Sequence, residues 1–140
     1  MKADMWKCLV LTVLVCIVAV GLPASAVDGE YLFDTLKKPA YCASWDALFR
    51  GKQVDSWLAR YSRTKDGPAA PSKTVIVRGV AYQANFVCKT HDCGDNNFIV
   101  LFAPSGQKAW GLLLTQNTKQ RFFGNPDPEM QDALIKATRE

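Results

Sequence analysis

Between residues 31 and 61 the apolar positions recur with the period of an α-helix. A short amphipathic stretch over 31–36 predicts one helical turn, closed by Pro39. A second helical pattern runs from residue 40 until Gly51 stops it. A third follows, with apolar residues at positions i, i+3, i+4 and i+7: Val54, Trp57, Leu58 and Tyr61. We expect these aromatic side chains to pack in the core, not to form a binding stripe, because a small domain must bury its large apolar groups.

A loop and then a two-residue period follow these helices. Residues 62–72 predict the loop, because Gly67-Pro68 and Pro71 break regular structure. Beyond it, apolar and polar positions alternate as they do in strands, and Arg78-Gly79 marks a tight turn between the first two. The third segment is rich in apolar residues and is therefore expected at the centre of the sheet. Five strands are predicted: 74–77, 80–87, 98–103, 109–115 and 121–123.

The last predicted element is a helix that begins near Asp127. Asp127 suits the N-cap, Pro128 the first helical position, and Lys136 and Arg139 the C-terminal end. Its expected inward face consists of Met130, Ala133, Leu134 and Ala137. The order of elements predicts an α+β fold, in which an antiparallel β-sheet meander of about five strands packs with N-terminal helices and a C-terminal helix.

The N-terminus carries the pattern of an export signal. Lys2 and Lys7 precede a nearly continuous apolar run over 8–22, and Ala24-Ser25-Ala26 follows as an A-x-A cleavage sequence. The run is shorter than the roughly 20 residues of a membrane span and lacks a basic stop-transfer flank. We therefore predict a cleaved secretory signal over 1–26 and a single domain over 27–140. A retained membrane anchor is the alternative.

The charge of the chain gives little guide to a partner. Lys and Arg number 17 and Asp and Glu 13, which leaves a formal net charge of +4. The basic residues share no periodic stripe, so a solvated surface explains them better than a nucleic-acid interface. We expect neither a nucleic-acid partner nor, after signal cleavage, a membrane partner.

Three cysteines lie beyond residue 26. Cys88 and Cys93 are expected to form a disulfide in an oxidising compartment, provided the chain turns back between them. Closing a loop this short removes little conformational entropy from the unfolded chain, so the disulfide is expected to shape the loop more than to stabilise the fold. Cys42 lies in an apolar helical pattern. It predicts a buried free thiol, with an intermolecular disulfide as the alternative.

The cysteine pair encloses His91, which is the only histidine of the chain. A zinc site formed with Cys42 would have enough ligands, but the spacing is not that of a zinc finger and oxidation competes for the thiols. Asp92 beside His91 suggests a catalytic pair, yet no nucleophile motif accompanies it. We therefore expect no enzyme activity, metal or cofactor. Two interpretations stay open, a stapled turn whose histidine faces water and a preorganised recognition loop.

A family resemblance favours recognition. Cys88-Lys89-Thr90-His91-Asp92-Cys93 resembles the signature loop Cys-Lys-Pro-His-Asp-Cys of the periplasmic inhibitor of vertebrate lysozyme family. The resemblance extends to residues 75–87 and to the later strand with Trp110-Gly111-Leu112, and covers most of 31–138. It implies a periplasmic, non-enzymatic, dimeric inhibitor of C-type lysozyme that protects a bacterium from host defence.

The resemblance also implies a mechanism. Lysozymes cut peptidoglycan with a pair of carboxylates in a cleft. The family's loop occupies that cleft, so His91 would meet the carboxylates, Cys88 and Cys93 would staple the loop, and Lys89 and Asp92 would flank or shape it. Thr90 departs from the family proline. This departure leaves room for other targets, such as the cell's own lytic transglycosylases, and for an envelope-binding paralogue that inhibits nothing.

Overall fold

Five strands form one antiparallel sheet in a computed structural model, which describes residues 28–116 and 120–139. The predicted signal over 1–26 lies outside the described residues. Strands adjacent in sequence are adjacent in the sheet, in the order β1-β2-β3-β4-β5. Their bounds are Ala69–Val77, Val80–Cys88, Asn97–Phe102, Ala109–Leu114 and Gln120–Phe123. The predicted α+β class and the antiparallel meander are thereby confirmed.

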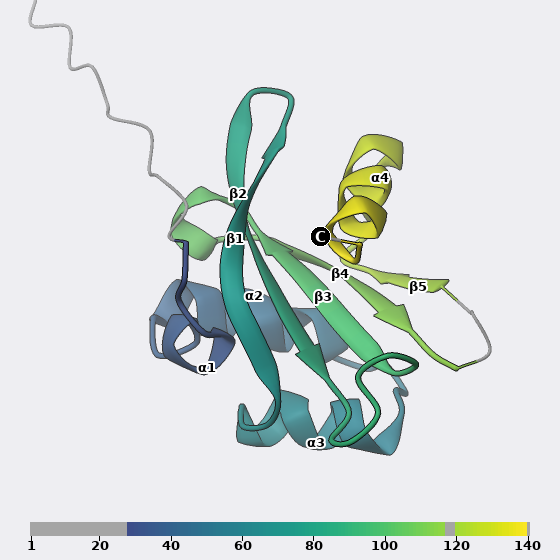
Figure 1. The fold of residues 1–140 in the computed structure, drawn as a ribbon. Helices are drawn as coiled ribbons and strands as arrows, with labels where there is room; N and C mark the ends of the chain where they lie inside the picture. The colour runs from purple at the N-terminus through teal and green to yellow at the C-terminus, as the bar shows by residue number, and fades with distance from the viewer. Residues whose placement is uncertain (1–27, 117–119, 140) are drawn as a thin grey trace, which may run out of the picture.

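Helices cover the two faces of the sheet unequally (Figure 1). Three helices near the N-terminus lie on one face, α1 (Leu32–Thr35), α2 (Pro39–Phe49) and α3 (Ser56–Thr64). The C-terminal helix α4 (Pro128–Ala137) lies on the other, and a short 3-10 helix, η1 (Pro104–Gly106), links β3 to β4. Among the helices of the described ranges, none has the length and apolar character needed to cross a bilayer.

β3 is the centre of the hydrophobic core because it contributes to both faces. All six of its residues are buried. Phe98, Val100 and Phe102 pack on the side of α1, α2 and α3, where Trp45 is also fully buried. Ile99 and Leu101 pack on the side of α4. A strand covered on both faces reads as a continuous apolar run, which explains why its central position could be predicted.

The predicted turn and cap signals act as expected. Arg78 and Gly79 both have positive φ, 52° and 75°, as the two-residue hairpin turn requires. The side chain of Asp127 accepts a hydrogen bond from the backbone N–H of Met130 at 2.9 Å, and Pro128 opens α4. Met130 and Leu134 are buried on the inward face of this helix.

The predicted loop over 62–72 is wrong at both ends. Helix α3 continues to Thr64, and β1 begins at Ala69. Pro71 is tolerated within β1 because this strand forms an edge of the sheet and its register shifts between Ala70 and Lys73. A residue without an N–H can occupy an edge or a bulge without losing a ladder bond.

Gly111 lets an aromatic ring lie directly on the sheet. It pairs with Val100 in the centre of the β3–β4 ladder, and a Cβ atom at this position would overlap the ring of Phe98. Phe98 is fully buried and contacts Trp45, Phe49 and Phe123 edge-on or tilted. The glycine therefore sets how closely the aromatic core approaches β4.

Replacing Gly111 with alanine should lower the free energy of unfolding by about 1–3 kcal/mol, because the buried ring has no room to move away. Urea unfolding monitored by far-UV circular dichroism measures this. Gly94→Ala is the matched control, because a Cβ atom there meets nothing within 4 Å. The control should change the unfolding free energy by less than about 0.5 kcal/mol. Equal effects of the two substitutions would contradict the close packing of Phe98.

Candidate functional site

The sheet presents one disulfide-closed loop between β2 and β3. Cys88 ends β2 and pairs with Asn97 at the start of β3, so the intervening residues form an excursion beyond the ladder. Cys88 and Cys93 form the predicted disulfide, with their Cα atoms 4.9 Å apart. Cys88 is buried and Cys93 is exposed. The bridge thus ties an exposed segment to the buried end of a strand.

A tight turn at the tip of the loop displays His91. The backbone N–H of Asp92 donates to the carbonyl oxygen of Lys89 at 3.0 Å, which makes Thr90 and His91 the two central residues of a turn. His91 has a φ of 63°, the left-handed value that type II turns require at their third position. Lys89, Thr90 and His91 are all exposed.

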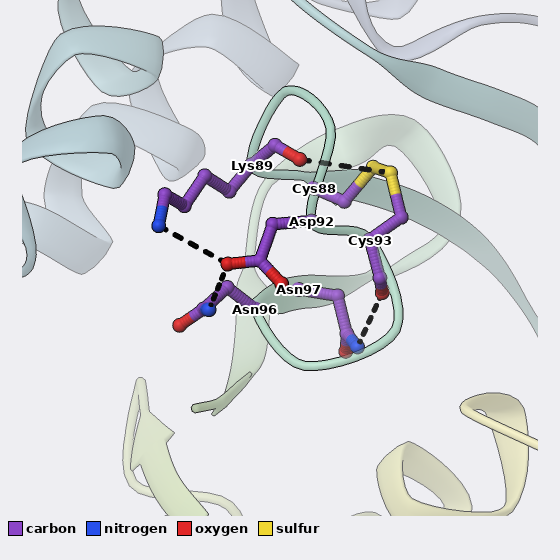
Figure 2. The surroundings of a disulfide bond; sticks show 6 residues. All are labelled: Cys88, Lys89, Asp92, Cys93, Asn96 and Asn97. Atoms are coloured by element: carbon purple, nitrogen blue, oxygen red, sulfur yellow. Dashed lines mark hydrogen bonds and ion pairs between the residues drawn. A yellow bond between two sulfur atoms is a disulfide. The ribbon is translucent and has the colours of Figure 1, made fainter. Parts of the chain in front are cut away.

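Asp92 holds the loop from within (Figure 2). Its carboxylate accepts hydrogen bonds from Lys89 Nζ at 3.1 Å and from Asn96 Nδ2 at 2.7 Å. Its carbonyl oxygen accepts from the backbone N–H of Asn96 at 3.0 Å. The bonds from Lys89 and Asn96 hold the pKa of Asp92 below its usual value. Of the two roles predicted for Lys89 and Asp92, this geometry favours loop shaping.

Hydrogen bonds hold the base of the loop to the start of β3 and to the residue that precedes β1. Asn97 Nδ2 donates to the carbonyl oxygen of Cys93 at 3.1 Å. The backbone N–H of Cys88 donates to the carbonyl oxygen of Pro68, just before β1, at 3.2 Å. The backbone N–H of Lys89 donates to the carbonyl oxygen of Asn96 at 3.0 Å. The loop is therefore ordered at its base by bonds that leave the tip side chains unused.

The imidazole of His91 stays available for a partner. Within residues 28–116 and 120–139 its side chain makes no hydrogen bond or ion pair with the protein. A neutral imidazole offers one donor and one acceptor, and its protonated form offers two donors. Such a group, on a turn that is already ordered, can enter a polar cleft with little loss of conformational entropy.

The cysteines do not assemble into a metal site. The disulfide occupies the sulfur atoms of Cys88 and Cys93, and the described residues hold no group of three or more His, Cys, Asp or Glu side chains that could bind a metal ion. Cys42 is a free thiol, but the predicted burial is wrong, because its side chain is only half-buried. The buried face of α2 consists of Ser44, Trp45 and Leu48, which leaves Cys42 on its flank.

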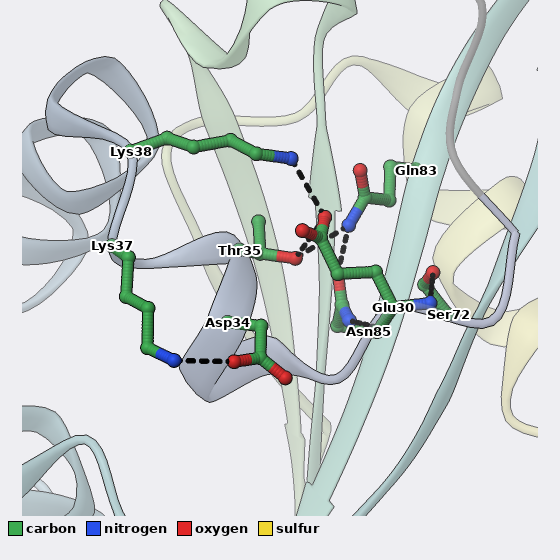
Figure 3. Close-up of polar contacts among 8 residues, drawn as sticks. All are labelled: Glu30, Asp34, Thr35, Lys37, Lys38, Ser72, Gln83 and Asn85. Atoms are coloured by element: carbon green, nitrogen blue, oxygen red, sulfur yellow. Dashed lines mark hydrogen bonds and ion pairs between the residues drawn. The ribbon is translucent and has the colours of Figure 1, made fainter.

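A second polar cluster fastens the N-terminal segment to the sheet (Figure 3). Gln83 and Asn85 lie on the β2 face that carries the three N-terminal helices and are only 2% and 1% exposed. Gln83 Nε2 donates to Thr35 Oγ1 at 2.8 Å and to Asn85 Oδ1 at 3.0 Å. Asn85 Nδ2 donates to the carbonyl oxygen of Glu30 at 3.1 Å. Sequence reasoning missed this cluster, although two amides at i and i+2 in a strand were its signal.

Glu30 connects this buried cluster to the surface. Its carboxylate accepts from Lys38 Nζ at 2.8 Å and from Thr35 Oγ1 at 3.0 Å. Burial alone would raise the pKa of Glu30, but the bonds from Lys38 and Thr35 outweigh it and hold that pKa below its usual value. The ionised carboxylate is therefore the form that the folded protein stabilises.

Comparison with known proteins assigns the chain to a family. The family model described as inhibitor of vertebrate lysozyme (Ivy) matches residues 21–139. A protein of Pseudomonas aeruginosa named inhibitor of vertebrate lysozyme is 30% identical over 128 residues, covering 81% of each chain. A protein of the same name from Escherichia coli K12 is 26% identical over 105 residues, covering 75% of this chain and 64% of its own. An uncharacterized protein of Yersinia pestis is 27% identical over 108 residues, covering 76% of this chain and 68% of its own.

Replacing Thr90 with proline should stabilise the loop. Thr90 occupies the second position of the turn, where the fixed φ of proline fits, and no backbone hydrogen bond uses its N–H. The free energy of unfolding should rise by about 0.4–1 kcal/mol, because proline restricts the unfolded chain. Chemical denaturation measures this, with Thr90→Ala as the control that lacks the ring. A loss of stability specific to the proline variant would contradict the turn assignment.

The contribution of Glu30 to stability should depend on pH. The pKa of Glu30 is lowered in the folded protein, so its ionised carboxylate stabilises the fold at pH values above 4.5, the ordinary pKa of the group. This stabilisation is lost as the pH falls through the pKa of the folded state. Wild type should therefore exceed Glu30→Gln in unfolding free energy at pH 7, and the difference should shrink towards pH 3. Urea denaturation at both pH values measures it. An equal difference at both would contradict the depressed pKa.

Proposed function

We propose that this chain, which belongs to the inhibitor of vertebrate lysozyme (Ivy) family, inhibits a C-type lysozyme by inserting its disulfide-closed loop into the active-site cleft of the enzyme. His91 meets the catalytic carboxylates, and the protein itself carries out no chemistry. One observation carries the proposal: the imidazole of His91 is exposed and makes no hydrogen bond in the described residues. The backbone at His91 has a φ of 63° and belongs to a turn within the loop that the Cys88–Cys93 disulfide closes.

The chemistry of the target suits this tip. A retaining glycosidase holds its two carboxyl groups about 5–5.5 Å apart. One imidazole ring can donate to one carboxylate and, when protonated, to both, and hydrogen bonds between charged groups are about twice as strong as neutral ones. The loop in the cleft then excludes the glycan sterically. The two carboxyl groups, bonded to the imidazole, can no longer act as acid and nucleophile.

The electrostatic attraction in this proposal is local. Lys89 is the cation beside the tip, but Asp92 already pairs with it, and the net charge of the whole chain is only +4. Long-range steering therefore contributes little, and recognition depends on the contact between the imidazole and the acidic cleft. Asp92 orders the loop and does not contact the enzyme.

We further propose the cellular setting that this function requires. Residues 1–26 act as a cleaved export signal, and the domain works in the periplasm, where the disulfide can form. A homodimer is proposed on the family resemblance alone. The cell's own lytic transglycosylases are a second candidate target, because Thr90 stands where the family loop carries proline.

Replacing His91 with alanine should abolish inhibition and leave the thermal midpoint nearly unchanged, because the side chain is exposed and makes no hydrogen bond or ion pair in the described residues. The measurement is clearance of a bacterial cell suspension by a C-type lysozyme, titrated with purified, oxidised protein.

Asp95→Ala is the matched control, because Asp95 is exposed in the same excursion but lies outside the disulfide ring. It should inhibit as wild type does. Stoichiometric inhibition by wild type and by Asp95→Ala, with none by His91→Ala, is the expected pattern. Equal inhibition by all three would overturn the role of His91. If folded wild type does not inhibit at all, the lysozyme proposal fails, and a lytic transglycosylase should be titrated in the same way.

A further inference from the structure

A groove runs between the edge strand β1 and helix α4, on the face of the sheet that the three N-terminal helices do not cover. It consists of two hollows of about 210 Å³ and about 290 Å³, which meet at Val75 and Ala137. Figure 1 shows α4 beside the β1–β2 hairpin on this face. Ligand pockets commonly have volumes of about 300–1,000 Å³, so the two hollows together reach the size of a small-molecule site.

Small side chains on α4 keep this groove open. Ala133 and Ala137 are four positions apart and therefore lie on the same side of the helix. Both are only half-buried, whereas Met130 and Leu134 are buried against the sheet. The face of α4 that the sequence predicts to point inward is therefore filled on one side and open on the side towards β1.

An irregularity in β1 borders the deeper hollow. The register of β1 against β2 shifts between Ala70 and Lys73. In a regular strand Ala70 and Pro71 would point to opposite faces, yet both line this hollow together with Lys73. Bulges commonly redirect side chains at sheet edges and beside functional sites. The bulge therefore brings to the groove residues that a regular strand would divide between the two faces.

The walls of the groove are mainly apolar. Val75 of β1 and Phe86 of β2 are half-buried, so each keeps surface that a ligand can reach. Ile99 of β3 is almost inaccessible and closes the bottom of the deeper hollow. The polar side chains of the lining, other than its lysines, already donate hydrogen bonds within the protein: Thr74 to Asp28 at 2.6 Å, Asn85 to Glu30 at 3.1 Å and Thr138 to Ile135 at 2.6 Å.

Such walls favour an alkyl chain over a peptide. A peptide in the groove would turn backbone N–H and C=O groups away from water and towards side chains that cannot bond to them, which costs free energy. A hydrocarbon chain has no polar groups to desolvate, and it gains free energy as its surface leaves water. The groove therefore fits an unbranched apolar chain.

Positive charge borders these apolar walls. Lys73 lines the deeper hollow and Lys136 the outer one, and both side chains are exposed. Among the described residues that line the two hollows, none is acidic. A lysine ammonium on its flexible stem can follow the position of an anionic group. Apolar walls with cations at their borders are complementary to a molecule that joins an apolar chain to an anionic head.

We propose that the groove between β1 and α4 binds a single-chain anionic amphiphile of the fatty-acid class. Its alkyl chain lies against Val75, Phe86 and the two alanines of α4, and its carboxylate lies at Lys73 or Lys136. The site goes beyond lysozyme inhibition, because it uses no residue of the disulfide loop and lies on the face of the sheet opposite α3.

The first test titrates the oxidised protein with dodecanoate in a calorimeter, below the critical micelle concentration of this fatty acid. Saturable binding with a 1:1 stoichiometry is expected. Butanoate has the same head group but too short a chain, and it should give no measurable binding. Dodecyl maltoside has the same chain without the charge, and it should bind more weakly than dodecanoate. Absence of saturable dodecanoate binding would overturn the proposal.

Filling the groove should remove the site. Ala137→Phe places an aromatic ring between α4 and β1 and should weaken dodecanoate binding about tenfold, the factor expected when two CH₂ groups lose their buried place. Ala43→Phe is the matched control, because Ala43 is exposed on α2, on the other face of the sheet, and it should bind as wild type does. Equal affinities of the two variants would overturn the location of the site.

The role of the cations is tested with the double variant Lys73→Gln/Lys136→Gln. It should bind dodecanoate about two- to fivefold more weakly, as the loss of a partly exposed ionic contact does, and dodecyl maltoside as wild type does. Lys37→Gln is the control, because Lys37 is exposed beside α1 and pairs with Asp34. Dodecanoate affinity that is equal in the double variant and in wild type would overturn the assignment of the head group.

A measurement on the wild type needs no variant that folds. In ¹⁵N-labelled protein with assigned backbone resonances, dodecanoate should shift the amide signals of Val75, Phe86 and Ala137 most and those of Lys89 and His91 little. Largest shifts outside the groove would overturn the site. Lysozyme inhibition is measured on the same protein, and its failure would count against the proposed function alone, because the groove and the loop share no residue.

Discussion

The burial of β3 on both faces is the constraint on which the remaining structure depends. A strand whose six residues are all inaccessible needs a cover on each side, and α4 supplies one while the three N-terminal helices supply the other. From Phe98 to Phe102 the strand therefore offers no side chain to a partner. The disulfide loop stands at the start of the strand, directly after Cys88 and before Asn97.

Much of this arrangement could be predicted because it depends on local chemistry. Asp127 and Pro128 identify the start of α4, Arg78-Gly79 identifies the hairpin turn, and the apolar run of β3 identifies a doubly covered strand. The disulfide could be predicted for the same reason, since its cysteines lie five positions apart at the end of a strand. Each signal is contained in a few consecutive residues and needs no knowledge of tertiary contacts.

The features that sequence reasoning missed depend on contacts between distant segments. In the sequence, Gln83 and Asn85 occupy the polar positions of an alternating strand, which usually face solvent. They are buried because the segment with Glu30 and Thr35 packs over them. Cys42 sits among apolar residues, yet the rotation of α2 places Ser44 on the buried face in its stead. Trp57 packs against the core, as its pattern predicts, but nothing in that pattern indicates that its N–H lacks a hydrogen-bond partner among the described residues.

The residues that order the loop are not the residues that its tip exposes. The disulfide, Asp92, Asn96 and Asn97 keep the turn in shape, and none of these contacts involves the side chain of Thr90 or His91. Either side chain at the tip can therefore be replaced without a compensating substitution among the residues that order the loop. What the tip presents can thus change by single substitutions, while the bonds that order the loop and fold the domain stay as they are.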